Sequence, residues 1–360
     1  MNPRTASATA PGAPGTPPGD YAVETRGLVK RFGRTVALAG VDLAIPVGCV
    51  FGVIGPNGAG KTTLMRLLLD IIRPTEGEIR VLGVDPRAGG PRLRARIGYL
   101  PGEVNLQGGL TARRLLTDFA RISGPVEPGR IDDLATTLGL DLDQRVRRLS
   151  KGNRQKLSLI QAFMHRPSLL VLDEPTSGLD PLVQQQFQAM ARQATAEGQT
   201  IVLSSHVLSE VQDAADSVAI LRHGRVVKIA TVAELRESAI RHARIVTAGR
   251  SETAVARSVA AIPGVGRMGT RPLPSDAGTG PVIECRATIA GPVAPFVAAV
   301  AELPLVDLVI EEPNLEEAVL SLYADEETDA AAADPNPAAA DPNPAAAADD
   351  ADSPERSAHA

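Results

Sequence analysis

The chain has 360 residues, of which 44% are hydrophobic and only 2% aromatic, so it is long enough for two domains with mainly aliphatic cores. From Ala324 onward it carries ten acidic residues and one Arg; subtracting this charge of −9 from the total of −5 leaves +4 for the remainder. So small a net positive charge argues against a nucleic-acid partner, because nucleic-acid binding requires a strongly basic face. No run of about 18 apolar residues occurs, which argues against a membrane span.

The first 20 residues are mostly Ala, Pro, Thr and Gly, a composition that predicts a disordered arm. Strand-like patterns follow at Ala22–Thr25 and Val36–Leu38. Between them, Phe32 lies among polar residues directly before a glycine. Its ring could stack on a nucleotide base or could be half-buried in a strand, and spacing alone does not separate the two.

A phosphate-binding loop is predicted between an apolar strand at Cys49–Ile54 and a helix that carries Leu64 and continues to Ile72. The intervening residues match the Walker A pattern, in which backbone N–H groups and a helix N-terminus surround phosphate oxygens. In this pattern Lys61 reaches the β- and γ-phosphates and Thr62 holds Mg²⁺. The candidate nucleotide-binding residues here are Gly55, Pro56, Asn57, Gly58, Ala59, Gly60, Lys61, Thr62 and Thr63.

A further strand is predicted at Ile97–Pro101, followed by a helical pattern from Thr111 to Leu140. Ser150 then precedes Lys151 and Gly152 at the start of another apolar-periodic helix, and Ser is a preferred N-cap residue. Such a helix start could also bind phosphate, although most Ser-x-Gly helix starts are only caps. We expect the segment of about residues 101–160 to form a helical insertion in an α/β domain.

The apolar run Leu169–Leu172 ends at Asp173 and Glu174, which indicates a buried strand with two carboxylates at its carboxyl end. Ligands bind at that end of open parallel sheets. Asp173 is the candidate Mg²⁺ ligand, and Glu174 is the candidate general base that activates the attacking water. The alternative is a simple Asp-Glu-Pro turn at the strand exit.

A tight turn is predicted at Ser177–Pro181, followed by a helix and by the strand Thr200–His206. A lone His is usually without function, but His206 ends a strand beside two others that carry catalytic-type groups. A hairpin with its turn at His223 and Gly224 completes this part of the chain.

The remaining sequence predicts a small α+β domain over residues 237–323, with Pro272–Thr279 as an internal loop. Its strands are expected at residues 245–246, 282–285 and 306–310, and its helices at residues 293–303 and 315–323. Residues 324–360 consist mainly of Ala, Asp, Pro and Asn, which predicts a disordered acidic tail.

Taken together, these stretches resemble the nucleotide-binding subunit of an ATP-binding-cassette (ABC) transporter, a P-loop NTPase with a mixed sheet and a helical insertion. The resemblance covers roughly residues 21–236, where several motifs follow one another in the family's order. The signature sequence Leu-Ser-Gly-Gly-Gln falls on Leu149–Asn153, where Lys151 and Asn153 depart from it. The resemblance places the adenine-stacking aromatic residue on Phe32, the signature contacts on Ser150 and Gly152, the D-loop on Ser177–Asp180 and the switch histidine on His206.

One departure concerns the Gln that usually follows the strand at residues 97–100 and contacts Mg²⁺. Here the chain reads Pro101, Gly102 and Glu103, so Glu103 is the candidate oxygen ligand in its place. Residues 311–318 and the late α+β domain look like the C-terminal extension of exporter subunits of the daunorubicin-resistance kind.

The resemblance implies a subunit that binds and hydrolyses ATP with Mg²⁺. It implies a head-to-tail pair of subunits, most simply a homodimer, in which Lys61 of one copy and Ser150 of the other hold one ATP. It further implies a separate multi-span permease, a place at the cytoplasmic face of the cell membrane, and export of a drug-like compound. The alternative is a soluble ABC-type ATPase acting on ribosomes or DNA. One Walker A loop and no sustained heptads argue against it.

Overall fold

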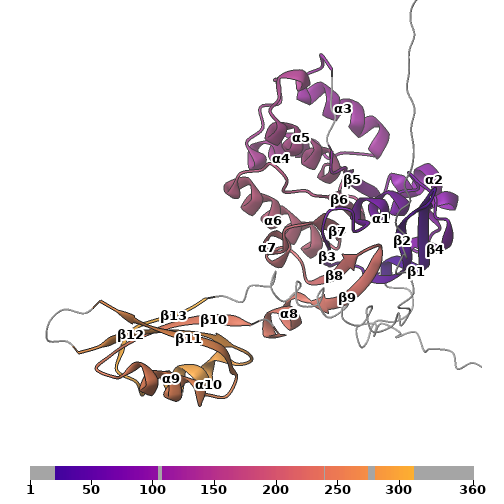
Figure 1. Cartoon of the computed structure of the whole chain (residues 1–360). Coiled ribbons are helices and arrows are strands. Elements are labelled where there is room, and N and C mark those ends of the chain that lie inside the picture. The colour runs from indigo at the N-terminus through magenta and orange to yellow at the C-terminus, as the bar shows by residue number, and fades with distance from the viewer. Residues whose placement is uncertain (1–20, 104–107, 239, 275–279, 312–360) are drawn as a thin grey trace, which may run out of the picture. The chain divides into compact units, whose positions relative to one another are not determined.

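A computed structural model describes residues 21–103, 108–238, 240–274 and 280–311 (Figure 1). The predicted N-terminal arm, the helix expected at 315–323 and the acidic tail lie outside these ranges. Within them, no helix combines the length and the apolar character needed to cross a membrane.

A six-stranded sheet forms the centre of the first part of the chain, in the order β5-β6-β7-β3-β8-β9. The first five of these strands are parallel and β9 is antiparallel to β8. Every residue of β3, β6 and β7 is buried, as expected for strands covered on both faces. The strands are β3 (Val50–Ile54), β5 (Ile97–Leu100), β6 (Leu169–Asp173), β7 (Thr200–Ser205), β8 (Ser217–Arg222) and β9 (Arg225–Thr231).

A smaller antiparallel sheet has the order β2-β1-β4, formed by β1 (Tyr21–Phe32), β2 (Thr35–Pro46) and β4 (Glu76–Val81). Its inward side chains share one apolar core with β3 and the first helix, α1 (Lys61–Leu68). This shared core fixes the small sheet against the phosphate-binding segment.

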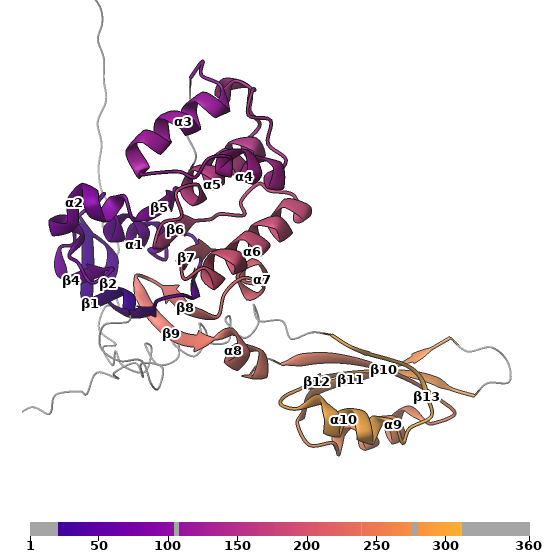
Figure 2. The ribbon, with the colours of Figure 1, turned by 180° about the vertical axis from the view of Figure 1, so that it is seen from behind.

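The helical insertion comprises α3 (Ala112–Ser123), α4 (Arg130–Leu138), the 3₁₀ turn η1 (Val146–Arg148) and α5 (Lys151–Phe163). Both views show α3, α4 and α5 grouped together (Figures 1 and 2). Three further helices complete this part of the chain: α2 (Pro86–Arg94), α6 (Pro181–Ala196) and α7 (Leu208–Gln212).

After α8 (Val232–Ser238), a second antiparallel sheet has the strand order β11-β12-β10-β13 and two helices on one face (Figure 2). Its chain order is β-α-β-β-α-β, the ferredoxin-like arrangement. The sheet and its helices enclose their own core, which includes Ile245, Val259, Cys285 and Phe296. The elements are β10 (Arg241–Ala248), α9 (Glu252–Ala260), β11 (Val265–Leu273), β12 (Val282–Ile289), α10 (Val293–Val300) and β13 (Leu305–Ile310).

Several element predictions were wrong in detail. The helix after the phosphate loop ends at Leu68 and does not continue to Ile72, because the chain turns at Asp70, which has a φ of +55°. Pro272 and Leu273 belong to β11 and not to a loop. Sequence reasoning missed β11 and α9, whose residues show weak apolar periodicity.

Candidate functional site

The parallel register of the large sheet brings three motif-bearing strand ends to one edge. Asp173 at the end of β6 pairs with Ser204 in β7, and Ile54 at the end of β3 pairs with Ser205. The Walker A loop, Glu174 and His206 directly follow the ends of β3, β6 and β7. The carboxyl edge of the sheet is therefore where the predicted catalytic groups converge.

Lys61 begins α1 and folds back over the loop that precedes it. Its Nζ donates hydrogen bonds to the carbonyl oxygens of Gly55, at 2.6 Å, and Pro56, at 3.2 Å, and the side chain is only 6% exposed. Burial lowers the pKa of Lys61, while the nearby carboxylates of Glu174 and Asp173 oppose that shift. Two neutral carbonyls thus hold the ammonium group, and a Glu174 carboxylate oxygen at 3.8 Å is its nearby anionic partner.

Glycines give the loop its shape. Gly60, the N-cap of α1, has a φ of +108°, and a Cβ at this position would lie 2.6 Å from the Ala37 carbonyl oxygen. A Cβ at Gly55 would collide with the Leu221 carbonyl oxygen. The N-terminus of α1 has no side-chain cap, which leaves its first backbone N–H groups open to a ligand. These are the properties of a phosphate-binding loop.

Asp173 is buried and has one occupied and one free carboxylate oxygen. Its Oδ1 accepts a 2.5 Å hydrogen bond from Ser204 Oγ, while its Oδ2 has no hydrogen-bond partner among the described residues. A buried, unpartnered carboxylate oxygen is costly unless something binds it. A hard divalent cation such as Mg²⁺ prefers this kind of donor, so the site fits the ion.

Glu174 connects the strand end to two other motifs. One carboxylate oxygen lies 2.8 Å from His206 Nδ1, and the other lies 3.8 Å from Lys61 Nζ. Its backbone has a φ of +51°, a left-handed conformation that costs a non-glycine residue about 1–3 kcal/mol. Ser204 stabilises this conformation because its Oγ accepts a hydrogen bond from the Glu174 N–H at 3.1 Å.

The other predicted nucleotide contacts lie at helix starts. Ser150 is exposed and caps α5, with its hydroxyl accepting a hydrogen bond from the Asn153 N–H at 3.1 Å. Gly152, the second residue of the helix, has no space for a side chain, since a Cβ would lie 2.9 Å from the Gly178 carbonyl oxygen. Asp180 caps α6 through the Val183 N–H at 3.0 Å. The structure shows Asp180 only in this capping role, so a contact between Asp180 and nucleotide stays a prediction.

Phe32 ends β1 with half of its surface exposed, and Lys30 Nζ lies 4.8 Å from its ring centroid. An exposed ring beside a cation is compatible with stacking on a base. Glu103 is exposed, and the neighbouring Gly102 approaches Asp173 closely, since a Cβ at Gly102 would lie 3.1 Å from Asp173 Oδ2. The metal role of Glu103 stays a prediction.

Sequence reasoning missed three polar residues behind the site. Ser204 binds both Asp173 and the Glu174 backbone. Glu210 accepts hydrogen bonds from Thr176 at 2.5 Å and from Ser205 at 3.2 Å. Gln155 donates to the carbonyl oxygens that follow β6. The only sequence signal was a polar residue within an apolar strand or helix face, which many structural residues share.

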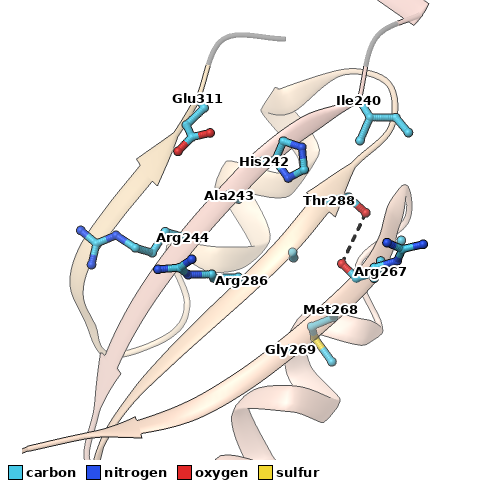
Figure 3. A pocket seen from close by; sticks show the side chains of 12 residues that line it. Ile240, His242, Ala243, Arg244, Arg267, Met268, Gly269, Arg286, Thr288 and Glu311 are labelled. Atoms are coloured by element: carbon cyan, nitrogen blue, oxygen red, sulfur yellow. Dashed lines mark hydrogen bonds between the residues drawn. The ribbon is translucent and has the colours of Figure 1, made fainter. Parts of the chain in front are cut away.

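A pocket of about 1060 Å³ is lined by residues of the second sheet (Figure 3). Its lining comes from β10, β11 and β12 and from residues next to β10 and β13, and it contains none of the motif residues. Figure 3 shows Arg244, Arg286 and Arg267 extending from three strands. Glu284 orders the first two, since its nearly buried carboxylate lies 3.7 Å from Arg244 and accepts a 2.9 Å hydrogen bond from Arg286.

Comparison with known proteins agrees with this geometry. The sequence profile of the ABC transporter family matches residues 38–177. A bacitracin transport ATP-binding protein of Enterococcus faecalis is 33% identical over 221 residues, covering 61% of this chain and 72% of that protein. A daunorubicin/doxorubicin resistance ATP-binding protein of Streptomyces peucetius is 36% identical over 222 residues, covering 60% of this chain and 67% of that protein.

A solved structure of an ATP-binding subunit of an ABC transporter superposes with a TM-score of 0.56 and 28% identity, over 60% of this chain and 92% of that one. The predicted fold class is thereby confirmed. The chain belongs to the ABC transporter family, as an ATP-binding subunit that hydrolyses ATP.

Proposed function

We propose that this subunit energises the export of a drug-like or lipophilic compound through a separate membrane permease at the cytoplasmic face of the cell membrane. The names of its relatives support this proposal, because they concern bacitracin transport and daunorubicin/doxorubicin resistance. They favour transport over the alternative of a soluble ATPase acting on ribosomes or DNA.

The proposal includes a head-to-tail pair of copies. Lys61 and the α1 N-terminus of one copy hold the phosphates, and Ser150 at the α5 N-terminus of the other copy completes the site. Two features of the chain support this arrangement. Ser150 is exposed, and the N-cap Ser150 and the second helical residue Gly152 lie at positions that match the family's signature. The positive end of the α5 helix dipole would favour the negative γ-phosphate.

Mg²⁺ would be held by Asp173 and Thr62, with Glu103 as the further candidate ligand. When bound, the ion would neutralise charge on the phosphate oxygens. Lys61 contributes a fixed positive charge beside the same oxygens. The free Oδ2 of Asp173 supports this assignment.

Glu174 would accept a proton from the water that attacks the γ-phosphate. The observation that carries this assignment is the position of its carboxylate between His206 Nδ1, at 2.8 Å, and Lys61 Nζ, at 3.8 Å. His206 orients one oxygen of the base, while Phe32 would stack on adenine. Hydrolysis removes the γ-phosphate that links the two copies, and their separation would drive the permease.

The test is Glu174→Gln, which keeps the side-chain shape but removes the base. We expect ATP hydrolysis to fall about 10²- to 10⁴-fold while ATP binding persists and ATP-dependent pairing becomes detectable by light scattering. Glu78→Gln, on an exposed position of β4, is the matched control. Hydrolysis at the wild-type rate by Glu174→Gln would show that the base assignment is wrong.

A further inference from the structure

Gln155 connects the helix of the signature sequence to the turn that carries the proposed base. It lies in α5 and is buried, with 4% of its surface exposed. Its Nε2 donates hydrogen bonds to the carbonyl oxygens of Glu174, at 3.1 Å, and Pro175, at 3.0 Å. A single amide group therefore binds two consecutive carbonyls that follow β6.

Hydrogen bonds from outside the turn support Glu174, whose left-handed backbone is unfavourable for a residue with a side chain. On its amino side, the Glu174 N–H donates to Ser204 Oγ at 3.1 Å and to the Ser204 carbonyl oxygen at 3.2 Å. On its carboxyl side, Gln155 binds the carbonyls of Glu174 and Pro175, and the Glu174 carbonyl also accepts a hydrogen bond from the Ser177 N–H at 3.2 Å. β7 and α5 together thus fix the direction in which the Glu174 side chain leaves the backbone.

The start of α5 also packs directly on the loop that follows this turn. A Cβ at Gly152 would lie 2.9 Å from the Gly178 carbonyl oxygen, and the Lys151 side chain would lie 3.4 Å from a Cβ at Gly178. Such close packing leaves little room for the helix start to move independently of the loop. The signature helix and the turn are therefore joined by hydrogen bonds and by packing.

We propose that Gln155 is a positioning residue for ATP hydrolysis: it holds the Glu174 backbone and so couples the signature helix to the base in the same subunit. This inference rests on the proposed role of Glu174. In a head-to-tail pair, the signature helix contacts the nucleotide held by the other copy. A displacement of α5 when it contacts that nucleotide would then move Glu174 of the same copy. Glu174 is the base that acts on the ATP bound to its own copy.

The principal test is Gln155→Met in the full chain, because Met has a similar size and lacks the N–H donors. Steady-state hydrolysis with ATP and MgCl₂, equilibrium ATP binding and thermal melting would be measured together. We expect kcat to fall by about tenfold or more, with KM for ATP and the binding constant within about twofold of the wild type. Gln161→Met, at a half-buried position of the same helix, is the matched control and should leave kcat, KM and the binding constant unchanged.

A second variant, Gln155→Glu, retains the length of the side chain and keeps the test valid if the Met variant does not fold. A carboxyl group can donate to a carbonyl only when it is protonated. Its kcat relative to the wild type should therefore rise as the pH is lowered from about 8.5 to about 6.

Wild-type kcat in Gln155→Met would overturn the inference, as would a pH-independent ratio for Gln155→Glu. A loss of ATP binding equal to the loss of kcat would also overturn it, because it would indicate a general structural role. Glu174→Gln distinguishes the two proposals. If Glu174→Gln abolishes hydrolysis and Gln155→Met does not lower kcat, only the role of Gln155 fails; if Glu174→Gln hydrolyses ATP normally, the proposed base fails.

Discussion

The Nδ1 atom of His206 lies 2.8 Å from Oε2 of Glu174, although 32 positions separate the two residues in the sequence. They meet because β6 and β7 are parallel neighbours and each residue directly follows its strand. The other Glu174 oxygen lies 3.8 Å from Lys61 Nζ, so one carboxylate contacts groups from two further motifs. Removal of any of these partners should change how that carboxylate is held.

The contact between His206 and Glu174 predicts a catalytic defect on removal of the imidazole. In His206→Ala the carboxylate would lose one of its two partners and could rotate away from the attacking water. We expect kcat for ATP hydrolysis to fall about tenfold or more, with ATP binding retained. His242→Ala, in the second sheet, is the control and should hydrolyse ATP at the wild-type rate; equal rates for both variants would contradict the prediction.

The close approach of Gly102 to Asp173 predicts sensitivity to a single methyl group. A Cβ at Gly102 would lie 3.1 Å from Asp173 Oδ2, the oxygen proposed to hold Mg²⁺. Gly102→Ala should therefore lower Mg²⁺-dependent hydrolysis by about ten- to hundredfold and raise the Mg²⁺ concentration needed for half-maximal rate. A Cβ at Gly109 would meet no atom within 4 Å, so Gly109→Ala is the matched control. An unchanged Mg²⁺ requirement in Gly102→Ala would argue against Asp173 as a ligand.

The arginine contacts of Glu284 predict that the second sheet loses stability in acid. Its carboxylate accepts hydrogen bonds from Arg271 at 2.9 and 3.1 Å and from Arg286 at 2.9 Å. The bonds from Arg271, followed by those from Arg286, hold the pKa of Glu284 below its usual 4.5, against the opposing effect of desolvation. The stabilisation is therefore complete above pH 4.5. It is lost as the pH falls below 4.5 and passes through the lower pKa of Glu284 in the folded state.

Glu284→Gln should lower the melting temperature at neutral pH, since a neutral amide binds the arginines less strongly. The difference in melting temperature from the wild type should shrink as the pH is lowered from about 7 to about 3. Melting curves of the full-length proteins would measure this difference, with Glu302→Gln, at an exposed position just after α10, as the control. A difference that stays constant over this range would contradict the assignment.

Most of the site was predictable because its motifs are local. The strand, loop and helix around Lys61 follow from apolar periodicity and glycine spacing, and the Asp173–Glu174 pair follows from carboxylates that end a buried run. The weakly periodic segments of the second sheet were not predictable in the same way. β11 contains two glycines and a proline, and its strand conformation depends on pairing with β12.

By itself the sequence determined which side chains are chemically able to bind phosphate and Mg²⁺, since a short motif needs only neighbouring residues to define it. The tertiary structure alone decided how these residues meet. Parallel pairing of β6 and β7 brings His206 to Glu174, and the packing of α5 brings Gln155 to the carbonyl oxygens after β6. Such contacts depend on sheet register and helix packing across long sequence separations, for which local residue patterns carry no unique signal.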